Sequence, residues 1–204
     1  MARTAETAEN RRTRLVVIAR GVIAEQGIAA CTFRTLAKAA GTSTRPFTHA
    51  FGTREALLRA VALTTWDTND LGVRTVIVGI ARPAHWNCID EVTQLGEAWL
   101  PLSDEKSSGE RIHLEIVLYG LSHPELEQEL LGFSSASNNH MAVIFSEGQK
   151  RQQLRTDRTV QELVMAYWSY AEGLSFSAVY EPKALPRDML LGLWRDGLRR
   201  LLQP

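Results

Sequence analysis

Cysteines are scarce in this sequence, and long apolar runs are missing. Cys31 and Cys88 are the only cysteines among 204 residues, too few for a disulfide framework and without the paired spacing of a zinc site. No stretch approaches the ~20 uncharged apolar residues that a membrane span needs. The N-terminal stretch has acidic residues and no small-residue cleavage site. We therefore expect a cytoplasmic protein.

Sequence motifs of the common enzyme classes are also missing. The patterns GxSxG, HExxH and GxxxxGK[ST] do not occur, and neither does GxGxxG after a strand. His113 and Glu115 are spaced as in a deaminase, but the cysteine pair of such a site is absent. We expect a protein that is not an enzyme and that has no cofactor and no metal.

What the sequence does contain is a series of helical patterns. Hydrophobic residues make up 45% of the chain and charged residues 23%, which is ordinary for a globular protein. Glycine and proline separate the helical patterns, and no apolar and polar alternation is long enough for a sheet. We predict an all-α fold of about nine helices, with a flexible arm at residues 1–10, a helix-turn-helix domain at 11–60 and a larger helical bundle at 61–204.

The first 60 residues contain clear helix boundaries. Apolar spacing predicts a helix over about 10–26, which ends at Gly27. Thr32 is placed to cap a short helix that ends near Gly41, and Ser43 to cap a second one that ends near Phe51. Thr53 then caps a longer helix that continues to about residue 78.

The later patterns are longer. We expect helices at about 90–100, at 111–121, from Pro124 to Gly148, at 159–180 and at 187–202, with a loop at 103–110 and a turn at 154–160. The helix at 111–121 is apolar on nearly every side, so we expect it to be central in the larger domain.

Positive charge is concentrated at the N-terminal end. The formal net charge is zero, yet residues 1–59 hold ten Arg or Lys and only four acidic residues. A basic N-terminal segment followed by an acidic remainder fits a polyanion partner that binds at one end of the protein. Chance segregation of charged residues on a solvated surface could produce the same distribution.

The two short helices form a helix-turn-helix pattern, whose second helix enters the major groove of DNA. Phe47 and Phe51 are four residues apart and would face inward. Arginine can read guanine, and Thr or His can reach bases or phosphates. The predicted DNA-binding residues are Thr32, Arg34, Thr44, Arg45, Thr48, His49, Thr53 and Arg54. Lys38 lies beside them.

The segment GIAACTFRTLAKAAGTSTRPFTHAFGTREALLRAV resembles the TetR family of bacterial transcriptional regulators, and the resemblance covers about residues 11–62. It implies an N-terminal DNA-binding domain and a larger domain that binds an inducer and dimerises through its last two helices. Four residues depart from the family pattern, namely Pro46, Thr48, Ala50 and Arg54. The stretch AYWSYAEGLSFSAVY resembles the subgroup with a choline-type regulator body.

The resemblance directs attention to aromatic residues of the larger domain, where an apolar or cationic small molecule could bind. The predicted ligand-binding residues are Trp99, His113, Tyr119, Met141, Phe145, Met165 and Trp168. The predicted interface of a homodimer consists of Tyr167, Tyr170, Leu174, Ala178, Leu191, Trp194, Leu198 and Leu201. Ser177 and Gly197 would allow close approach of the partner, although a monomer could bury the same residues in its own core.

These predictions combine into a dimeric repressor that a ligand releases from a palindromic operator. The alternative is a DNA-binding regulator whose larger domain binds a protein partner and has no small-molecule inducer. Activation and repression are equally compatible with the sequence, because the difference depends on where the operator lies.

Overall fold

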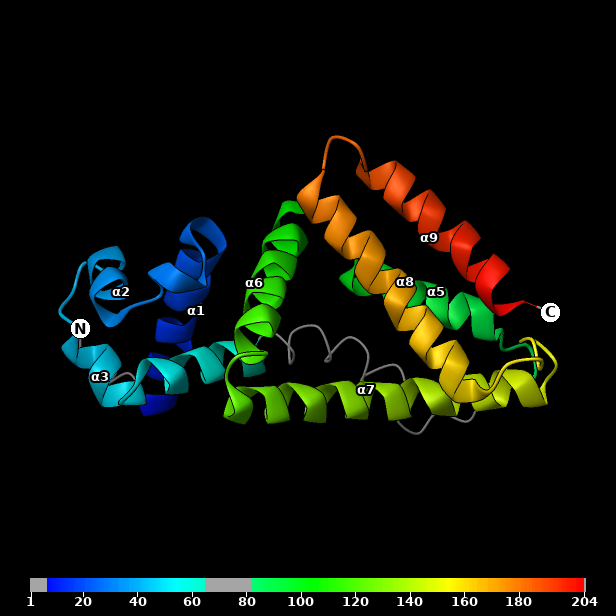
Figure 1. Cartoon of the computed structure of the whole chain (residues 1–204), viewed down its shortest axis with the longest axis horizontal. Helices are drawn as coiled ribbons and strands as arrows, with labels where there is room; N and C mark the ends of the chain where they lie inside the picture. The colour runs from blue at the N-terminus through cyan, green and yellow to red at the C-terminus, as the bar shows by residue number, and fades with distance from the viewer. Residues whose placement is uncertain (1–6, 65–81, 204) are drawn as a thin grey trace, which may run out of the picture. The chain divides into compact units, whose positions relative to one another are not determined.

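The computed structural model describes residues 7–64 and 82–203 (Figure 1). These residues form helices and connecting turns without any β-strand, so the all-α prediction is confirmed. They form two compact units. The first unit contains residues 7–64 together with 111–127, and the second contains 82–110 together with 128–203. Residues 111–127, which the sequence analysis assigned to the larger domain, thus pack in the first unit.

Helix α1 (Ala8–Gln26) begins the first unit and agrees with the prediction. The side chain of Thr7 caps it by accepting a hydrogen bond from the Asn10 amide. Gly27 ends it with a φ of 79°, a conformation that glycine adopts without steric cost. The buried face consists of Leu15, Val16, Ala19, Val22 and Ile23.

A short 3₁₀ turn, η1 (Ile28–Ala30), leads to α2 (Phe33–Ala39) and α3 (Arg45–Phe51). Thr32 caps α2 as predicted, because its hydroxyl accepts from the Thr35 amide at 3.2 Å. The cap predicted at Ser43 is wrong. Thr44 holds the cap position of α3 and makes no side-chain capping bond. Pro46 stands in the first turn of α3 and has no N–H, so it removes one of the two N–H donors that a capping side chain can use.

A further helix occupies residues 54–64 at the end of the first described range. The hydroxyl of Thr53 caps it by accepting from the Ala56 amide at 3.1 Å, as predicted. The predicted continuation of this helix to about residue 78 lies outside the described residues.

The second unit begins with α5 (Cys88–Trp99), which Asn87 caps. Helix α6 (Asp104–Gly120) follows along the chain, with residues 104–110 in the second unit and residues 111–120 in the first. The loop predicted at 103–110 is therefore wrong. Ser103 accepts a hydrogen bond from the Lys106 amide at 3.2 Å. Two acidic residues in the first turn add a favourable interaction with the helix dipole. The polar composition of 103–110 therefore marks a helix start and not a loop.

The prediction that the helix at 111–121 is central in the larger domain is also wrong, because residues 111–127 pack in the first unit. Ile112 and Ile116 are buried, but Leu118 is 66% exposed and Leu121 is 65% exposed. The helix therefore buries only one face. An apolar side chain is buried only where another part of the protein packs against it, and composition alone does not show where that is.

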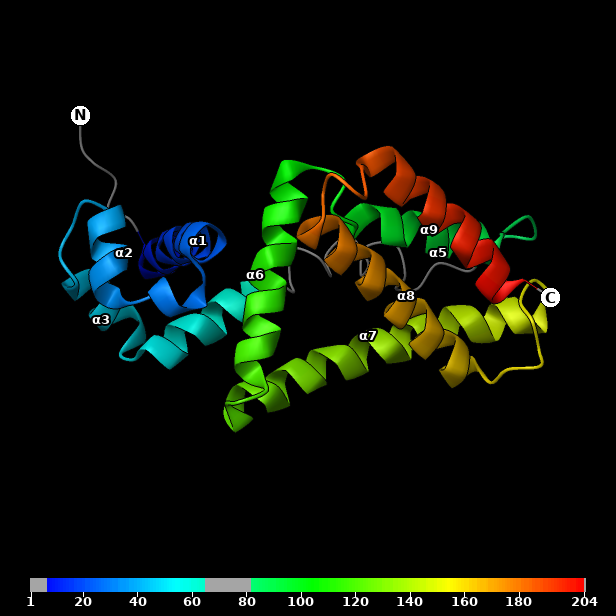
Figure 2. The ribbon, with the colours of Figure 1, turned by 45° about the horizontal axis from the view of Figure 1, so that its top comes forward.

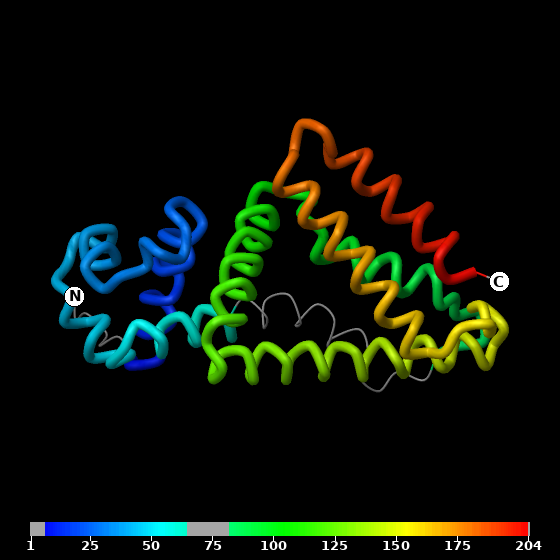
Figure 3. Tube along the Cα trace, in the orientation of Figure 1, coloured from blue at the N-terminus to red at the C-terminus, as the bar shows by residue number. Residues whose placement is uncertain are grey.

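The remaining helices match their predictions closely. Pro124 opens α7 (Pro124–Lys150), which runs two residues past the predicted end. Helix α8 (Val160–Tyr180) starts with a capping box between Thr159 and Glu162. Helix α9 (Arg187–Leu202) returns antiparallel beside α8, as Figures 2 and 3 show. The predicted turn at 154–160 is present.

The core of the second unit is rich in aromatic side chains. Tyr167 is 0% exposed and donates a hydrogen bond to the Val92 carbonyl at 3.1 Å. Its ring packs edge-on against Phe145, Trp168 and Trp194. The Trp194 indole N–H donates to the Thr93 carbonyl at 2.9 Å. These bonds connect α8 and α9 to α5.

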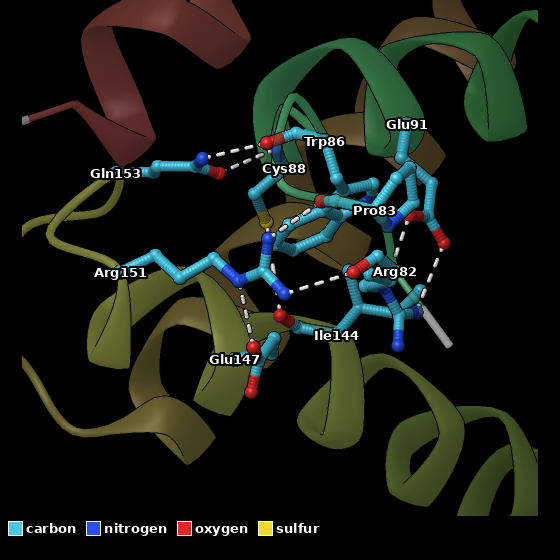
Figure 4. Close-up of polar contacts among 9 residues, drawn as sticks. All are labelled: Arg82, Pro83, Trp86, Cys88, Glu91, Ile144, Glu147, Arg151 and Gln153. Atoms are coloured by element: carbon cyan, nitrogen blue, oxygen red, sulfur yellow. Dashed lines mark hydrogen bonds and ion pairs between the residues drawn. The ribbon is translucent and has the colours of Figure 1, made fainter. Parts of the chain in front are cut away.

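A polar cluster ties the start of α5 to the end of α7 (Figure 4). The guanidinium groups of Arg82 and Arg151 lie 4.9 and 5.2 Å from the centre of the Trp86 ring. Arg82 pairs with Glu91 at 3.0 Å, and Arg151 pairs with Glu147 at 2.7 Å. Their charges are thus satisfied within the chain.

In the described part of the chain, no helix is long and apolar enough to cross a membrane.

Candidate DNA-binding surface and ligand-binding region

Helix α3 presents polar side chains to solvent from an apolar base. Phe47 and Phe51 are 0% and 7% exposed, so they fix the orientation of this seven-residue helix. Arg45, Thr48 and His49 lie on the exposed side, as the spacing of the two phenylalanines predicted. An arginine and two hydrogen-bonding side chains on one exposed face are suitable for contacts with base edges and phosphates.

The surroundings of α3 supply further groups for phosphate contact. Thr44 is exposed, and so are Arg34 and Lys38 on α2. The capping threonines Thr32 and Thr53 are exposed as well. Helix starts leave backbone N–H groups that can bind phosphate oxygens. The predicted DNA-binding residues other than Arg54 are therefore all accessible to a partner.

Arg54 is half-buried and makes three internal hydrogen bonds. It donates to the carbonyls of Cys31 at 2.9 Å and Ile28 at 2.7 Å, and to the Tyr119 hydroxyl at 3.0 Å. A guanidinium group has five N–H donors, so two remain for a phosphate. The main role that the structure gives to Arg54 is to link the turn before α2 to α6.

The same link continues along α6, and the sequence analysis missed it. Glu115, one turn before Tyr119, accepts a hydrogen bond from the Ile28 amide at 3.2 Å. In the turn that follows α6, the ring of His123 stacks on the Tyr119 ring with centroids 3.7 Å apart. Glu115, Tyr119 and His123 follow one another at intervals of four residues, which the sequence displays. No local pattern, however, identifies residues 28–31 and 54 as the partners of this row.

Another missed contact supports α3 directly. Arg12 on α1 donates to the Ala50 carbonyl at 2.6 Å, and its guanidinium lies 4.4 Å from the centre of the Phe51 ring. This side chain was counted only as part of the basic N-terminal charge. The structure shows that it also holds the end of α3 against α1.

Cys31 and Cys88 are both 0% exposed. Burial raises the pKa of the Cys31 thiol to about 11 and that of Cys88 to about 12. Both thiols are therefore protonated at neutral pH and act as small apolar side chains.

The predicted ligand-binding residues divide into three groups. Trp99, Met141, Phe145 and Trp168 belong to the core of the second unit or pack against it. Met165 points away from this core and is 56% exposed. Two others belong to the first unit, namely His113 and Tyr119. Burial lowers the pKa of His113 to about 4, so its imidazole is neutral at pH 7. The structure thus brings four of the seven residues together.

The tryptophan pair carries unusual polar atoms. The rings of Trp99 and Trp168 are 5.0 Å apart between centroids. Both indole Nε1 atoms are buried and have no hydrogen-bond partner among residues 7–64 and 82–203. The Ser175 hydroxyl is likewise buried and has no hydrogen-bond partner among these residues. Buried polar groups are normally paired, so these three atoms are exceptions within the described part of the chain.

Two carboxyl groups of the second unit have raised pKa values, that of buried Glu110 and that of Glu172, whose side chain is exposed. Glu110 on α6 is only 7% exposed. Burial, with a further contribution from the negative charge of Glu172, raises the pKa of Glu110 to about 7. Desolvation also raises the pKa of Glu172 on α8. Neither carboxylate has an ion pair or hydrogen bond within the described part of the chain.

The predicted dimer interface largely faces the core of the chain itself. Tyr167, Trp194 and Leu198 are each 0% exposed, and Ala178 is 8% exposed. The rest of the predicted set is half-buried, namely Tyr170, Leu174, Leu191 and Leu201. The Tyr170 ring occupies the space beside Gly197 that was expected to admit a partner. Helical periodicity identified a buried stripe correctly, but this stripe packs within one chain.

A different apolar surface is exposed on α8 and α9. Its members are Met165, Phe176, Tyr180, Met189 and Leu193, which are 44–71% exposed. The rings of Phe176 and Tyr180 stack on each other with centroids 5.5 Å apart. We call these five residues the outer face of α8 and α9.

Comparisons with known proteins show similarity in the N-terminal sequence and in the fold. Residues 15–61 match the family described as bacterial regulatory proteins, tetR family. A comparison with curated proteins gave no match. One similar solved structure is a putative transcriptional regulator from Saccharomonospora viridis in complex with choline. It has a TM-score of 0.83 and 17% identity over 95% of this chain and 98% of that one.

Two further solved structures share the fold. A ketosteroid transcriptional regulator of Mycobacterium tuberculosis has a TM-score of 0.69 and 16% identity, over 99% of this chain and 100% of that one. A TetR family transcriptional regulator from Thermus thermophilus has a TM-score of 0.72 and 17% identity, over 93% and 97% of the two chains. The similarity thus extends over both units.

Proposed function

We propose that this chain is a sequence-specific DNA-binding regulator of the tetR family of bacterial regulatory proteins, whose family model matches residues 15–61. The observation that carries the proposal is the exposed side of α3, where Arg45, Thr48 and His49 project from a helix anchored by buried Phe47 and Phe51. In a helix-turn-helix domain this is the helix that enters the major groove. A regulator of this kind acts where the DNA lies, in the cytoplasm, and needs no enzyme activity.

The proposed DNA contacts fall into two classes. Arg45, Thr48 and His49 would read base edges or nearby phosphates, whereas Arg34 and Lys38 would contact the phosphate backbone. Thr32, Thr44 and Thr53 stand at helix starts, where backbone N–H groups also bind phosphates. Arg54 would contribute only through the N–H groups that its internal bonds leave available.

We further propose that the regulator is a homodimer that uses the outer face of α8 and α9. Five large apolar side chains exposed on two adjacent helices favour association with a second copy, because their burial removes apolar surface from water. Two copies related by a twofold axis would present two α3 helices to successive major grooves, which repeat every ~34 Å along DNA. The operator is therefore expected to be a palindrome.

Sedimentation equilibrium tests the dimer. Phe176→Asp places a charge at the centre of the outer face and should yield monomers at concentrations where the wild-type chain is dimeric. Leu131→Asp is the matched control, since Leu131 is 61% exposed on α7 and outside that face. Equal dimerisation of both variants would locate the interface elsewhere.

The larger part of the chain is proposed to bind a small-molecule ligand beside Trp99 and Trp168. Unpaired buried polar atoms next to an aromatic pair support a ligand more than they support an ordinary core. One solved neighbour is a complex with choline, so a small molecule binds to at least one protein of this fold.

Repression would end when the ligand favours a conformation that binds DNA poorly. By thermodynamic linkage, a ligand that weakens operator binding must itself bind less tightly to the DNA-bound protein. A ligand affinity that is identical with and without operator DNA would exclude this mechanism. It would favour the alternative, in which the larger part of the chain binds a protein partner.

The proposal as a whole is tested by DNA selection from a random duplex library with the purified wild-type chain. Enrichment of a palindrome is the expected result.

A further inference from the structure

The exposed side of α3 carries two threonines whose hydroxyl groups are engaged differently. Thr44 stands at the start of the helix, and its side chain makes no capping bond. The Thr48 hydroxyl, in contrast, donates a hydrogen bond to the Thr44 carbonyl at 3.2 Å. The same carbonyl accepts from the Thr48 amide at 3.0 Å. A hydroxyl has a single proton to donate, so the proton of Thr48 is used within the helix and is not available to a partner.

The engagement of its hydroxyl decides which part of the Thr48 side chain meets a partner. Threonine in a helix has few side-chain conformations, and they include those in which the hydroxyl bonds the carbonyl one turn earlier. The methyl group stands on the same tetrahedral Cβ, so it points away from that carbonyl. Thr48 is exposed, and the buried rings of Phe47 and Phe51 fix the side of α3 on which it lies. The group that Thr48 offers to a partner is therefore its methyl group.

A methyl group distinguishes one base in the major groove of DNA. Thymine carries a C5 methyl group there, whereas the edges of adenine, guanine and cytosine are read through hydrogen-bonding atoms. Acceptor atoms such as guanine O6 and thymine O4 need a donor, which Thr48 does not offer in this conformation. Apolar contact with a threonine methyl group is one of the ways in which proteins recognise thymine. Thymine is thus the base that best fits Thr48.

Thr48 lies close enough to Arg45 for both side chains to contact one half-site. They are three residues apart, which places them on the same side of α3 with a rise of ~4.5 Å between them. Bases along one DNA strand repeat every ~3.4 Å. Both belong to the first four residues of α3, and the N-terminal residues of such a helix contact base edges. A thymine read by Thr48 would therefore lie about one or two base pairs from a guanine read by Arg45.

We propose that Thr48 is a specificity-determining residue, whose methyl group packs against the C5 methyl group of a thymine in each half-site of the operator. This inference rests on the proposed DNA-binding function and adds one base to the sequence that α3 recognises. The contact is favourable because it removes apolar surface from water, and one buried methyl group corresponds to a roughly 4-fold change in affinity. A donor role for Thr48 would instead require its bond to the Thr44 carbonyl to break.

Deoxyuridine substitution tests the thymine, because deoxyuridine lacks only the C5 methyl group. The probe is the duplex that selection from a random library enriches, and fluorescence anisotropy at physiological salt measures its binding to the wild-type chain. Thymines are replaced one position at a time, in both half-sites. We expect one position near the guanine of Arg45 at which replacement weakens binding roughly 15-fold, because two half-sites each contribute roughly 4-fold. The absence of such a position, or a half-site without thymine, would overturn the inference.

Two variants at Thr48 separate the methyl group from the hydroxyl. Thr48→Ser keeps the hydroxyl and removes the methyl group, so it should bind the thymine duplex as weakly as the wild-type chain binds the deoxyuridine duplex. Deoxyuridine at the sensitive position should cause this variant no further loss. Thr48→Val keeps a methyl group and removes the hydroxyl, so it should retain both the affinity and the sensitivity to deoxyuridine. Undiminished sensitivity in Thr48→Ser would contradict the inference, and so would a Thr48→Val variant that binds as weakly as Thr48→Ser.

Thr13→Ser is the matched control. The Thr13 hydroxyl donates to the Glu9 carbonyl at 3.1 Å, which is the same bond to the preceding turn, and Thr13 is exposed on α1. This substitution should therefore repeat any effect on helix stability, measured by circular dichroism, and leave DNA affinity unchanged. Equal losses of affinity in Thr13→Ser and Thr48→Ser would show a general effect of the substitution and contradict the thymine contact.

The outcomes also separate this inference from the proposed function. If selection enriches no duplex, the DNA-binding proposal fails and the thymine contact fails with it. If a duplex is enriched but no thymine in it depends on Thr48, only the thymine contact fails.

Discussion

Replacement of Glu110 by glutamine should stabilise the folded chain in a pH-dependent manner. Burial and the charge of Glu172 raise the pKa of Glu110 from 4.5 to about 7. The folded state therefore binds the proton more tightly than the unfolded state does. The stability contributed by the neutral form is complete below pH 4.5 and is lost as the pH rises through 7. Glutamine has no charge to bury, so the variant avoids this loss.

The magnitude follows from the size of the pKa shift. Each pKa unit corresponds to ~1.4 kcal/mol, so the buried carboxylate destabilises the wild-type chain by about 3 kcal/mol at pH 8. At pH 5 the same linkage gives a difference below about 1 kcal/mol. Urea unfolding of both proteins at pH 5 and pH 8, followed by circular dichroism, measures this difference directly.

The matched control is Glu105→Gln on the same helix. Glu105 is exposed in the first turn of α6, where its charge interacts favourably with the helix dipole. Its replacement should lower stability slightly, by about 0.3–1 kcal/mol. If Glu110→Gln shows no gain at pH 8 relative to pH 5, then Glu110 is not destabilised by burial and the reasoning fails.

Four further variants probe other parts of the account. Arg45→Ala should weaken binding to the preferred duplex by ~1–3 kcal/mol and random duplex less, measured by fluorescence anisotropy; equal losses on both would make Arg45 a phosphate contact. Gly96→Ala should destabilise the chain by ~1–3 kcal/mol in urea unfolding, because a Cβ at this position would overlap the Trp194 indole. Its control is Gly132→Ala, where the new Cβ has free space and should stabilise α7 by ~1 kcal/mol. Tyr119→Phe removes an acceptor of Arg54 and should lower stability by about 1–2 kcal/mol; no change would show that this hydrogen bond is not formed in solution.

Local signals predicted most helix boundaries. Thr32 and Thr53 cap helices where the sequence pattern placed them, and Gly27 ends α1 with a positive φ. These features depend on residues within one turn of the chain, which a single sequence displays. The prediction of a loop at 103–110 was wrong because serine, acidic residues and glycine are typical both of loops and of the first turn of a helix.

Tertiary partners could not be predicted in the same way. The spacing of Tyr167, Trp194 and Leu198 correctly indicates a buried stripe, but periodicity does not tell whether the stripe packs within one chain or against a second one. The bonds of Arg54 to residues 28 and 31 and to Tyr119 join segments far apart in sequence. The exposure of Arg45, Thr48 and His49 was predictable because the two phenylalanines of α3 define its inner side.

The central claim is that the exposed side of α3 reads a DNA sequence. Selection from a random duplex library with the purified wild-type chain at physiological salt, followed by sequencing, tests it most directly. The account predicts enrichment of a palindrome whose half-sites are centred about one helical turn, or a multiple of it, apart. A folded, dimeric chain that enriches no sequence would contradict it.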